Sequence, residues 1–253
     1  MKKLLSILLI FIPTLFFGWS KSGHRVIGQI AEKLMTDEAI TNMNAVLNDA
    51  GAAMVANWGD FVKSDPRFKQ FSSWHYTNLP ADLSRDKFEA AALDTFSGQC
   101  IYRVIQLVDI LKDNPSDVNC LKMLIHIVGD MFQPMHLGSV YDLGGNKVPI
   151  TWFGKKSNLH SLWDDGLIDG EKLSYTEYAT FLLNTHKPQR IEYSPQAVFD
   201  AAWKTYQITE KIYKEKDKVS DHYKYIYAYK SIWEQQFVDG GILLGTILQY
   251  IYQ

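Results

Sequence analysis

The sequence has only two cysteines among its 253 residues, which excludes a small scaffold held together by many disulfides. It also has no excess of positive charge, with 26 basic against 28 acidic residues, and so lacks the cationic surface that usually holds long nucleic acids. No glycine-rich phosphate loop, internal repeat or sustained strand alternation is present. These absences exclude several common classes of enzyme and binding protein.

A long hydrophobic run is present only at the start of the chain. After Lys2 and Lys3, residues 4–17 are almost entirely apolar, a length too short to span a bilayer but typical of a secretory signal peptide. We expect residues 1–18 to be removed, although Phe16 is unfavourable for cleavage before Trp19 and a retained N-terminal anchor is the alternative. The remaining chain, with 24 basic and 28 acidic side chains, is expected to be secreted or periplasmic, with no stable membrane partner.

Apolar side chains recur at helical spacing through most of residues 19–253. Asn, Pro, Ser, Thr and Asp residues mark where several helices begin or end. Residues 137–158 contain two adjacent glycines, a proline and a further glycine, which predict a long loop with at most a short hairpin. The sequence therefore predicts an all-α single domain over 19–253, with helices near 26–35, 36–49, 98–112, 117–133, 195–214, 221–237 and 240–252.

The two cysteines, Cys100 and Cys120, fall on two of these helices, which are expected to be antiparallel neighbours. The rise of a helix places them roughly a dozen Å apart, which is too far for a disulfide. We therefore expect two buried free cysteines.

Histidines and acidic residues recur at a spacing that suits metal ligands. His126 and Asp130 lie four residues apart, so they share one face of a helix, and the apolar run around His126 makes an unpaired histidine costly there. Pro134 should end this helix and let His136 approach a second ion, and His160 and Asp164 repeat the four-residue spacing. One such pair alone is more often a capped or surface pair than a metal site.

Three more candidates stand earlier in the chain. Asp60 occurs in a Trp-Gly-Asp-Phe segment, His75 follows a tryptophan, and His24 lies near the expected new N-terminus. Alone, Asp60 would be read as a helix cap. Zinc accepts imidazole and carboxylate ligands, and hydrolytic zinc sites keep a position open for water. His186 and His222 fall outside this pattern and are expected at the surface.

The order of these motifs resembles the zinc-dependent nuclease I family, the single-strand-specific nucleases of fungi and plants that are related to zinc phospholipases C. The resemblance covers the whole chain after residue 18, including Gly144-Gly145-Asn146 and the segment 158–164. It implies an endonuclease that hydrolyses phosphodiester bonds in single-stranded DNA or RNA and leaves 5′-phosphate ends. We expect a monomer, although the sequence leaves the oligomeric state open. Activity on 3′-nucleotides and the preferred sugar and base stay open.

The resemblance also implies three zinc ions and their ligands. The first ion would be held by Asp60, His75, His126 and Asp130. The second would be held by His136, His160 and Asp164. The third would be held by the amine and carbonyl oxygen of Trp19, by His24 and by the other oxygen of Asp130. The nucleophile would be a hydroxide bridging two of the ions.

Two residues are predicted to assist the reaction directly. Asp60 would orient the nucleophile, and Lys63 would neutralise charge that develops on the phosphate oxygens. Lys63 departs from the arginine usual in the family and lacks its planar fork of donors. We therefore expect reduced or altered activity.

Candidate substrate-binding residues follow from the need to hold an unstacked base. Tyr76 and Leu143 would form the two sides of a slot, although plain core packing is the other reading of Tyr76. Asn78 would contact the base edge, where fungal members have Asp. Asn146 would either help to hold phosphate or shape its turn.

Two other functions compete with this prediction. A zinc phospholipase C would share the metals, but those enzymes have Glu where this chain has Asp164, and no separate membrane-binding domain follows the helical region. A non-catalytic zinc-binding protein is the second, but nine ligand residues for three ions leave open coordination positions, which favours catalysis.

Overall fold

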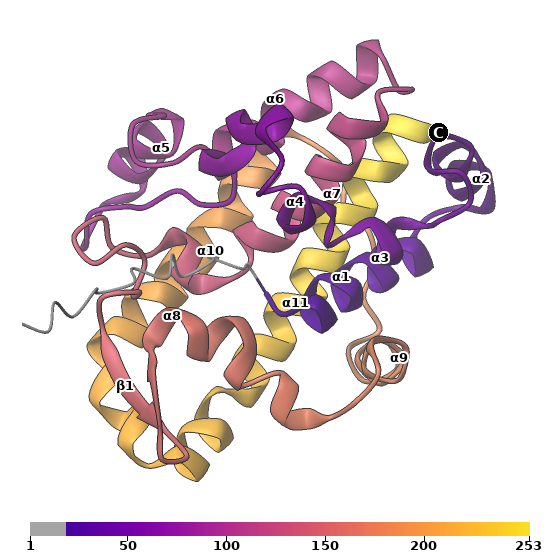
Figure 1. Ribbon diagram of the computed structural model, residues 1–253. Coiled ribbons are helices and arrows are strands. Elements are labelled where there is room, and N and C mark those ends of the chain that lie inside the picture. Colours follow the sequence, from indigo (N-terminus) through magenta and orange to yellow (C-terminus); the bar gives the residue numbers. More distant parts are fainter. Residues whose placement is uncertain (1–18) are drawn as a thin grey trace, which may run out of the picture.

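The computed structural model describes residues 19–253, and the expected signal peptide lies outside these residues. Eleven α-helices and a two-stranded hairpin are present in this range, so the prediction of an all-α domain is confirmed (Figure 1). The longer helices are α1 (Lys21–Leu34), α2 (Asp37–Leu47), α5 (Arg85–Leu93), α6 (Cys100–Asp113), α7 (Val118–Met131), α9 (Tyr175–His186), α10 (Pro195–Lys214) and α11 (His222–Tyr252). The short ones are α3 (Ala52–Val55), α4 (Trp58–Phe61) and α8 (Leu159–Ser161).

Side-chain caps explain why several helices begin where the sequence predicts. Thr36 accepts a hydrogen bond from the amide of Ala39 at the start of α2, and Asp117 caps α7 by accepting from two amides of its first turn. Ser194 caps α10, and the proline after it fits the first helical position. These polar residues set the helix starts to within a few residues of the prediction.

The C-terminal region departs from the prediction of two helices. A single helix of 31 residues, α11, runs from His222 to Tyr252 without a break at Gly240 and Gly241. Helix α1 packs along α11, as the two ribbons crossing the centre of Figure 1 show. Packing of this kind outweighs the low helix propensity of glycine.

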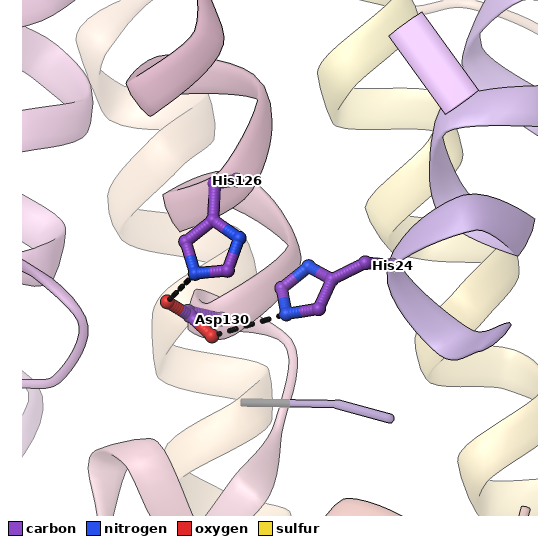
Figure 2. A group of neighbouring side chains, drawn as sticks. All are labelled: His24, His126 and Asp130. Atoms are coloured by element: carbon purple, nitrogen blue, oxygen red, sulfur yellow. Dashed lines mark ion pairs between the residues drawn. The ribbon is translucent and has the colours of Figure 1, made fainter. Parts of the chain in front are cut away.

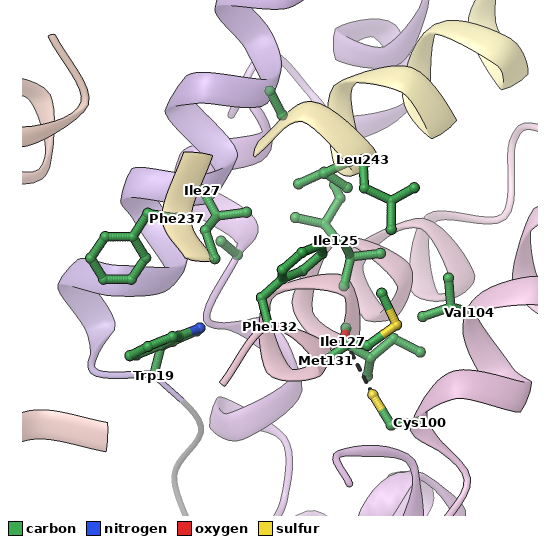
Figure 3. Close-up of a cluster of buried hydrophobic side chains, with 14 of the residues drawn as sticks. Trp19, Ile27, Cys100, Val104, Ile125, Ile127, Met131, Phe132, Phe237 and Leu243 are labelled. Atoms are coloured by element: carbon green, nitrogen blue, oxygen red, sulfur yellow. Dashed lines mark hydrogen bonds between the residues drawn. The ribbon is translucent and has the colours of Figure 1, made fainter. Parts of the chain in front are cut away.

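The hydrophobic core lies between α1, α6, α7 and α11. Figure 3 shows Ile27 of α1, Ile125 and Met131 of α7 and Leu243 of α11 pointing toward one another, and each is almost fully buried. Because α7 belongs to this core, its position is set by packing on its apolar side.

Both cysteines are free, as predicted. Cys100 is buried, and its thiol donates to the carbonyl oxygen of Ile127 at 3.3 Å. Cys120 is only half-buried, so the prediction that both are buried was wrong; it lies in the first turn of α7, next to solvent. Burial and the neighbouring Asp117 carboxylate raise the pKa of Cys120 to about 12.

The loop predicted over 137–158 is present and is anchored to α10. The hydroxyl of Tyr213 donates to Asp142 Oδ1 at 2.8 Å and accepts from the amide of Ser139 at 3.2 Å. Strands β1 (Pro149–Trp152) and β2 (Lys155–Asn158) then form an antiparallel hairpin. Within residues 19–253, no helix has both the length and the apolar character needed to cross a membrane.

The remaining turns are short and irregular. The 3₁₀ segments are η1 (Pro66–Trp74), η2 (Pro134–Leu137), η4 (Asp169–Glu171) and η5 (Lys216–Ser220), and η3 (Leu162–Gly166) is a π-helix. Two of them, η2 and η3, carry candidate ligands.

Candidate metal centre

The polar side of α7 forms the middle of the site. His126 and Asp130 both have no exposed surface, and His126 Nε2 lies 3.1 Å from Asp130 Oδ2. The other carboxylate oxygen of Asp130 lies 3.4 Å from Nε2 of His24, which comes from α1 (Figure 2). Asp130 thus faces two histidines from two helices with its two oxygens.

Two residues from earlier in the chain lie on another side of Asp130. His75 follows η1, and its Nδ1 lies 2.9 Å from Asp130 Oδ2 and 3.8 Å from Asp60 Oδ1. Asp60 lies inside the short helix α4, whose N-cap is Asn57, so Asp60 is not a helix cap. His126 Nε2 is 3.6 Å from Asp60 Oδ1.

The other three candidates gather on the loop side of α7. His136 lies on η2, immediately after α7, and its Nδ1 is 3.4 Å from Asp130 Oδ1. His160 Nε2 lies 3.4 Å from Asp164 Oδ2. These two residues span the junction of α8 with the π-helix η3, where the amide of Leu167 donates to the carbonyl of Leu162, five residues back.

Eight of the nine predicted ligands therefore converge. Their donor atoms form three groups, each with atoms within 4.8 Å of one another. The groups are His24, His126 and Asp130; Asp60, His75 and His126; and His136, His160 and Asp164.

The ninth, Trp19, lies beside the group of His136, His160 and Asp164. The amide of Ser20 donates to the main-chain oxygen of Asp164 at 2.7 Å, which holds the main chain next to Trp19 there. The indole of Trp19 is fully buried, with its ring centroid 4.9 Å from that of Phe237 (Figure 3).

Hydrogen bonds to main-chain carbonyls fix the orientation of three histidine rings. Nδ1 of His126 lies 2.7 Å from the oxygen of Ala56, Nδ1 of His136 lies 2.6 Å from the oxygen of His75, and Nδ1 of His160 lies 2.7 Å from the oxygen of Gly144. Donation from Nδ1 leaves Nε2 unprotonated, which is the arrangement that orients metal-bound histidines in proteins. The donor set therefore fits zinc.

Two glycines make room for the rings. A Cβ atom on Gly59 would lie 2.4 Å from Cδ2 of His126, and one on Gly129 would lie 2.5 Å from Nδ1 of His24. Any side chain at either position would displace a candidate ligand.

Burial and mutual proximity shift the pKa values of the cluster. Burial lowers the pKa of His75 to about 4 and that of His160 to about 3. Burial alone would raise the pKa of Asp130, but His126 and His136 outweigh it and hold this pKa well below its ordinary value. Neutral imidazole and ionised carboxylate are the forms that bind metal.

Burial has the opposite effect on Asp164. It raises the pKa of this carboxyl well above its ordinary value, and the nearby carboxylates add to the shift. A cation bound beside Asp164 would stabilise its charged form.

The predicted catalytic pair lies at the edge of the centre. Lys63 Nζ is 2.6 Å from Asp60 Oδ1, and both side chains are largely buried. This places one positive charge beside the carboxylate that groups with His75 and His126.

The predicted base-binding residues lie on two neighbouring segments. The amide of Thr77 donates to the carbonyl of His136, and that of Leu79 donates to the carbonyl of Gly138, so the chain around Tyr76 and Asn78 runs beside the 136–144 loop. Tyr76 and Asn78 are half-buried, and Asn78 Oδ1 lies next to Gly144.

Leu143 and Asn146 lie in the turn of that loop. Leu143 is 43% exposed, and its main-chain oxygen accepts a hydrogen bond from the side-chain amide of Asn146 at 2.9 Å. This contact matches the turn-shaping interpretation of Asn146.

The histidines outside the pattern stay outside the site. His186 is exposed, as expected, whereas His222 is half-buried against the ring of Trp152. Neither belongs to the three groups.

One residue near the centre was missed by the sequence interpretation. Gln133 is fully buried, and its side-chain amide donates to Asp164 Oδ1 while its oxygen accepts from the amide of Met135. Its position between Asp130 and His136, directly before Pro134, was the available signal.

A helical protein that gathers eight histidine and aspartate side chains in one centre has the donor chemistry of a metal-binding protein. The chain belongs to the S1/P1 nuclease family, whose model matches residues 19–253. Family membership and the three groups together support zinc binding.

Individual relatives match over part of their length. Over 169 residues, the chain is 27% identical to Endonuclease 3 of Arabidopsis thaliana, a match that covers 62% of this chain and 57% of that protein. It is 26% identical to Nuclease S1 of Aspergillus oryzae, covering 62% and 56%. It is 29% identical to Nuclease P1 of Penicillium citrinum, covering 63% of each. The chain thus spans little more than half the length of most of these relatives.

Proposed function

We propose that this protein is a zinc-dependent endonuclease that hydrolyses phosphodiester bonds in single-stranded DNA or RNA and leaves 5′-phosphate ends. The observation that carries the proposal is the convergence of three histidine–aspartate groups in a member of the S1/P1 nuclease family. The relatives' names, nuclease and endonuclease, support the same activity.

The proposal assigns three zinc ions to these residues. Asp60, His75, His126 and Asp130 would hold one ion; His136, His160 and Asp164 would hold a second; and His24, Asp130 and the freed amine and carbonyl oxygen of Trp19 would hold a third. The hydrogen bond from Ser20 to Asp164 supports the last assignment, because it keeps the main chain at Trp19 beside the centre. A free amine requires cleavage after Gly18, so the proposal includes a signal peptide over 1–18 and a secreted or periplasmic location.

Zinc, when bound, supplies positive charge to the phosphate oxygens and lowers the pKa of the attacking water. The protein's own residues orient the reactants. Asp60 accepts a hydrogen bond from the attacking water, and Lys63 contacts a non-bridging oxygen of the phosphate. The water loses a proton to solvent as its oxygen bonds to phosphorus, the bond between phosphorus and the 3′ oxygen breaks, and the 3′ oxygen takes up a proton from solvent to become a hydroxyl.

Preference for single strands follows from the proposed base slot. An unstacked base would lie between the ring of Tyr76 and the side chain of Leu143, with Asn78 at its edge. The exposure of Leu143 and the nearness of Asn78 to Gly144 support this arrangement. We assign Asn146 to shaping the turn, because its amide is held by Leu143.

The zinc phospholipase C alternative is not favoured, because the matching family model and the curated relatives are nucleases.

We also propose that the protein functions as a monomer.

The deciding experiment uses the full chain, secreted by a bacterial host and purified. Its zinc content and first residue are measured, followed by product release from single-stranded DNA, RNA, 3′-nucleotides and phosphatidylcholine. We expect about three zinc ions, Trp19 as the first residue, and cleavage of single-stranded nucleic acid that a chelator abolishes and zinc restores. The proposal would be contradicted if the protein released product from phosphatidylcholine but from no nucleic acid, or if removal of the metal left cleavage of nucleic acid undiminished.

A further inference from the structure

A cavity of about 500 Å³ lies next to the metal centre and shares only Asp60 with the three ligand groups. Its volume falls in the range of small-molecule sites. It is formed where α1, α3, α4 and α7 meet, four elements that lie together in Figure 1. We call it the α1–α4 cavity, and its lining includes Lys21, Arg25, Met54, Trp58, Phe61 and Lys122.

Three cations line this cavity, namely Lys21, Arg25 and Lys122. Among residues 19–253, no carboxylate lies within ion-pair distance of Lys21, Arg25 or Lys122. Nε of Arg25 is buried and makes no hydrogen bond. Aromatic rings lie near two of these cations: the guanidinium of Arg25 is 5.8 Å from the ring centroid of Tyr175, and Lys122 Nζ is 5.9 Å from that of Trp58.

An exposed aromatic side chain lies at the rim of the cavity. Phe61 ends α4, directly after Asp60, and is 82% exposed. Exposed aromatic rings beside unpaired cations are the combination that binds single-stranded nucleic acid, since bases stack on the rings and phosphates pair with the cations. On a chain with more acidic than basic residues, such a local site supplies what the surface as a whole lacks.

We propose that the α1–α4 cavity is a second nucleotide subsite. Arg25 and Lys122 bind the phosphate of a nucleotide neighbouring the one that is cleaved, and its base stacks on Phe61. A strand whose scissile phosphate reaches Asp60 continues directly into this cavity, because Asp60 lines both. This inference rests on the proposed nuclease function.

The charge test compares substrates of two lengths. We measure kcat/KM for a ten-nucleotide oligothymidylate and for the dinucleotide, and divide the first by the second. In the double variant Arg25→Gln/Lys122→Gln, this quotient should fall by about tenfold. The slope of log KM for the longer substrate against log salt should become shallower by about 0.7, since the variant no longer neutralises one phosphate of a single strand. Lys204→Gln, which removes an exposed lysine of α10, is the matched control and should change neither value.

The stacking test uses affinity rather than turnover. Fluorescence anisotropy measures binding of labelled oligothymidylate with phosphorothioate linkages, and of an abasic strand of the same length. Phe61→Ala should weaken binding of the first about tenfold more than that of the second, and Phe61→Trp should restore it. Tyr227→Ala, at a residue that is 90% exposed on α11, is the aromatic control.

The outcomes separate the two proposals. If the wild-type protein cleaves no nucleic acid but the Arg25 and Lys122 double variant and Phe61→Ala still weaken binding, the nuclease function fails and only nucleotide binding by the cavity stands. If the wild-type protein cleaves both substrates while these variants behave like Lys204→Gln and Tyr227→Ala, the subsite is overturned and the nuclease function stands.

Discussion

The two sides of α7 pack into the protein interior in two different ways. One side places Ile125 and Met131 in the hydrophobic core, where apolar side chains fit together without any further component. The other side buries His126 and Asp130 among other titratable groups. Burial of apolar groups is favourable by itself, whereas burial of histidines and carboxylates is costly unless they are paired or bound to metal. The two sides should therefore respond differently to mutation and to zinc.

The largest difference is expected at Asp130. The substitution Asp130→Asn keeps the size of the side chain but removes the charge that faces His24, His75 and His126. We expect the loss of two of the three proposed ions and a fall in kcat/KM of at least about a thousandfold. Zinc analysis and oligonucleotide cleavage measure both effects. Asp86→Asn, at an exposed position of α5, is the control, and equal zinc content in the two variants would contradict the prediction.

The apolar side of this comparison was readable from the sequence. Helical spacing of apolar residues and polar caps such as Thr36 and Asp117 define most helices to within a few residues. The break expected near Gly240 was wrong because sequence spacing carries no information about α1, whose packing keeps α11 continuous. Local signals thus predict helices, but contacts between distant segments decide where two of them merge.

Next in size is a change on the apolar side. Leu243→Ala removes a side chain that is 2% exposed and should cost roughly 2–5 kcal/mol of the free energy of unfolding, or a fall in Tm of roughly 5–15 °C. Zinc content should stay the same, and added zinc should still raise Tm. Thermal unfolding with and without a chelator checks this, with Leu173→Ala, at an exposed leucine, as the control. Loss of zinc from Leu243→Ala would show that the two sides are not independent.

The polar side was predictable for a different reason. His126 and Asp130, and His160 and Asp164, have a spacing that suggests ligands, but only the order of motifs along the whole chain joined them into one centre. The sequence does not reveal the carbonyls of Ala56 and Gly144 that orient the rings, because these contacts join segments far apart in the chain. The same limit hid the α1–α4 cavity, which forms only when four helices meet.

A smaller effect is expected at Lys63, which is not a proposed ligand. Lys63→Ala removes the charge beside Asp60 and should lower kcat about a hundredfold while leaving zinc content unchanged. Lys63→Arg should keep or raise kcat, since its planar fork binds two phosphate oxygens at once. Steady-state kinetics on one oligonucleotide give both values. Wild-type turnover in Lys63→Ala would exclude the proposed role.

The smallest effect is expected where the two sides meet. Gln133 lies between α7 and η2, fully buried, and orients Asp164 through its side-chain amide. Gln133→Leu keeps the volume but removes this donor, so the affinity for the ion held by His136, His160 and Asp164 should fall about 10–100-fold. Gln236 offers a matched control, because it is equally buried but donates to Phe132 and Thr205 rather than to a proposed ligand.

A chelator titration distinguishes these two glutamine variants. Both should lower Tm, since each leaves buried polar groups without a partner. Only Gln133→Leu should release one zinc ion at a lower chelator concentration than the wild-type protein, while its other ions stay bound. If Gln236→Leu releases zinc equally early, packing around α7 rather than the hydrogen bond to Asp164 controls the affinity of that ion, and the division between the two sides of α7 does not hold there.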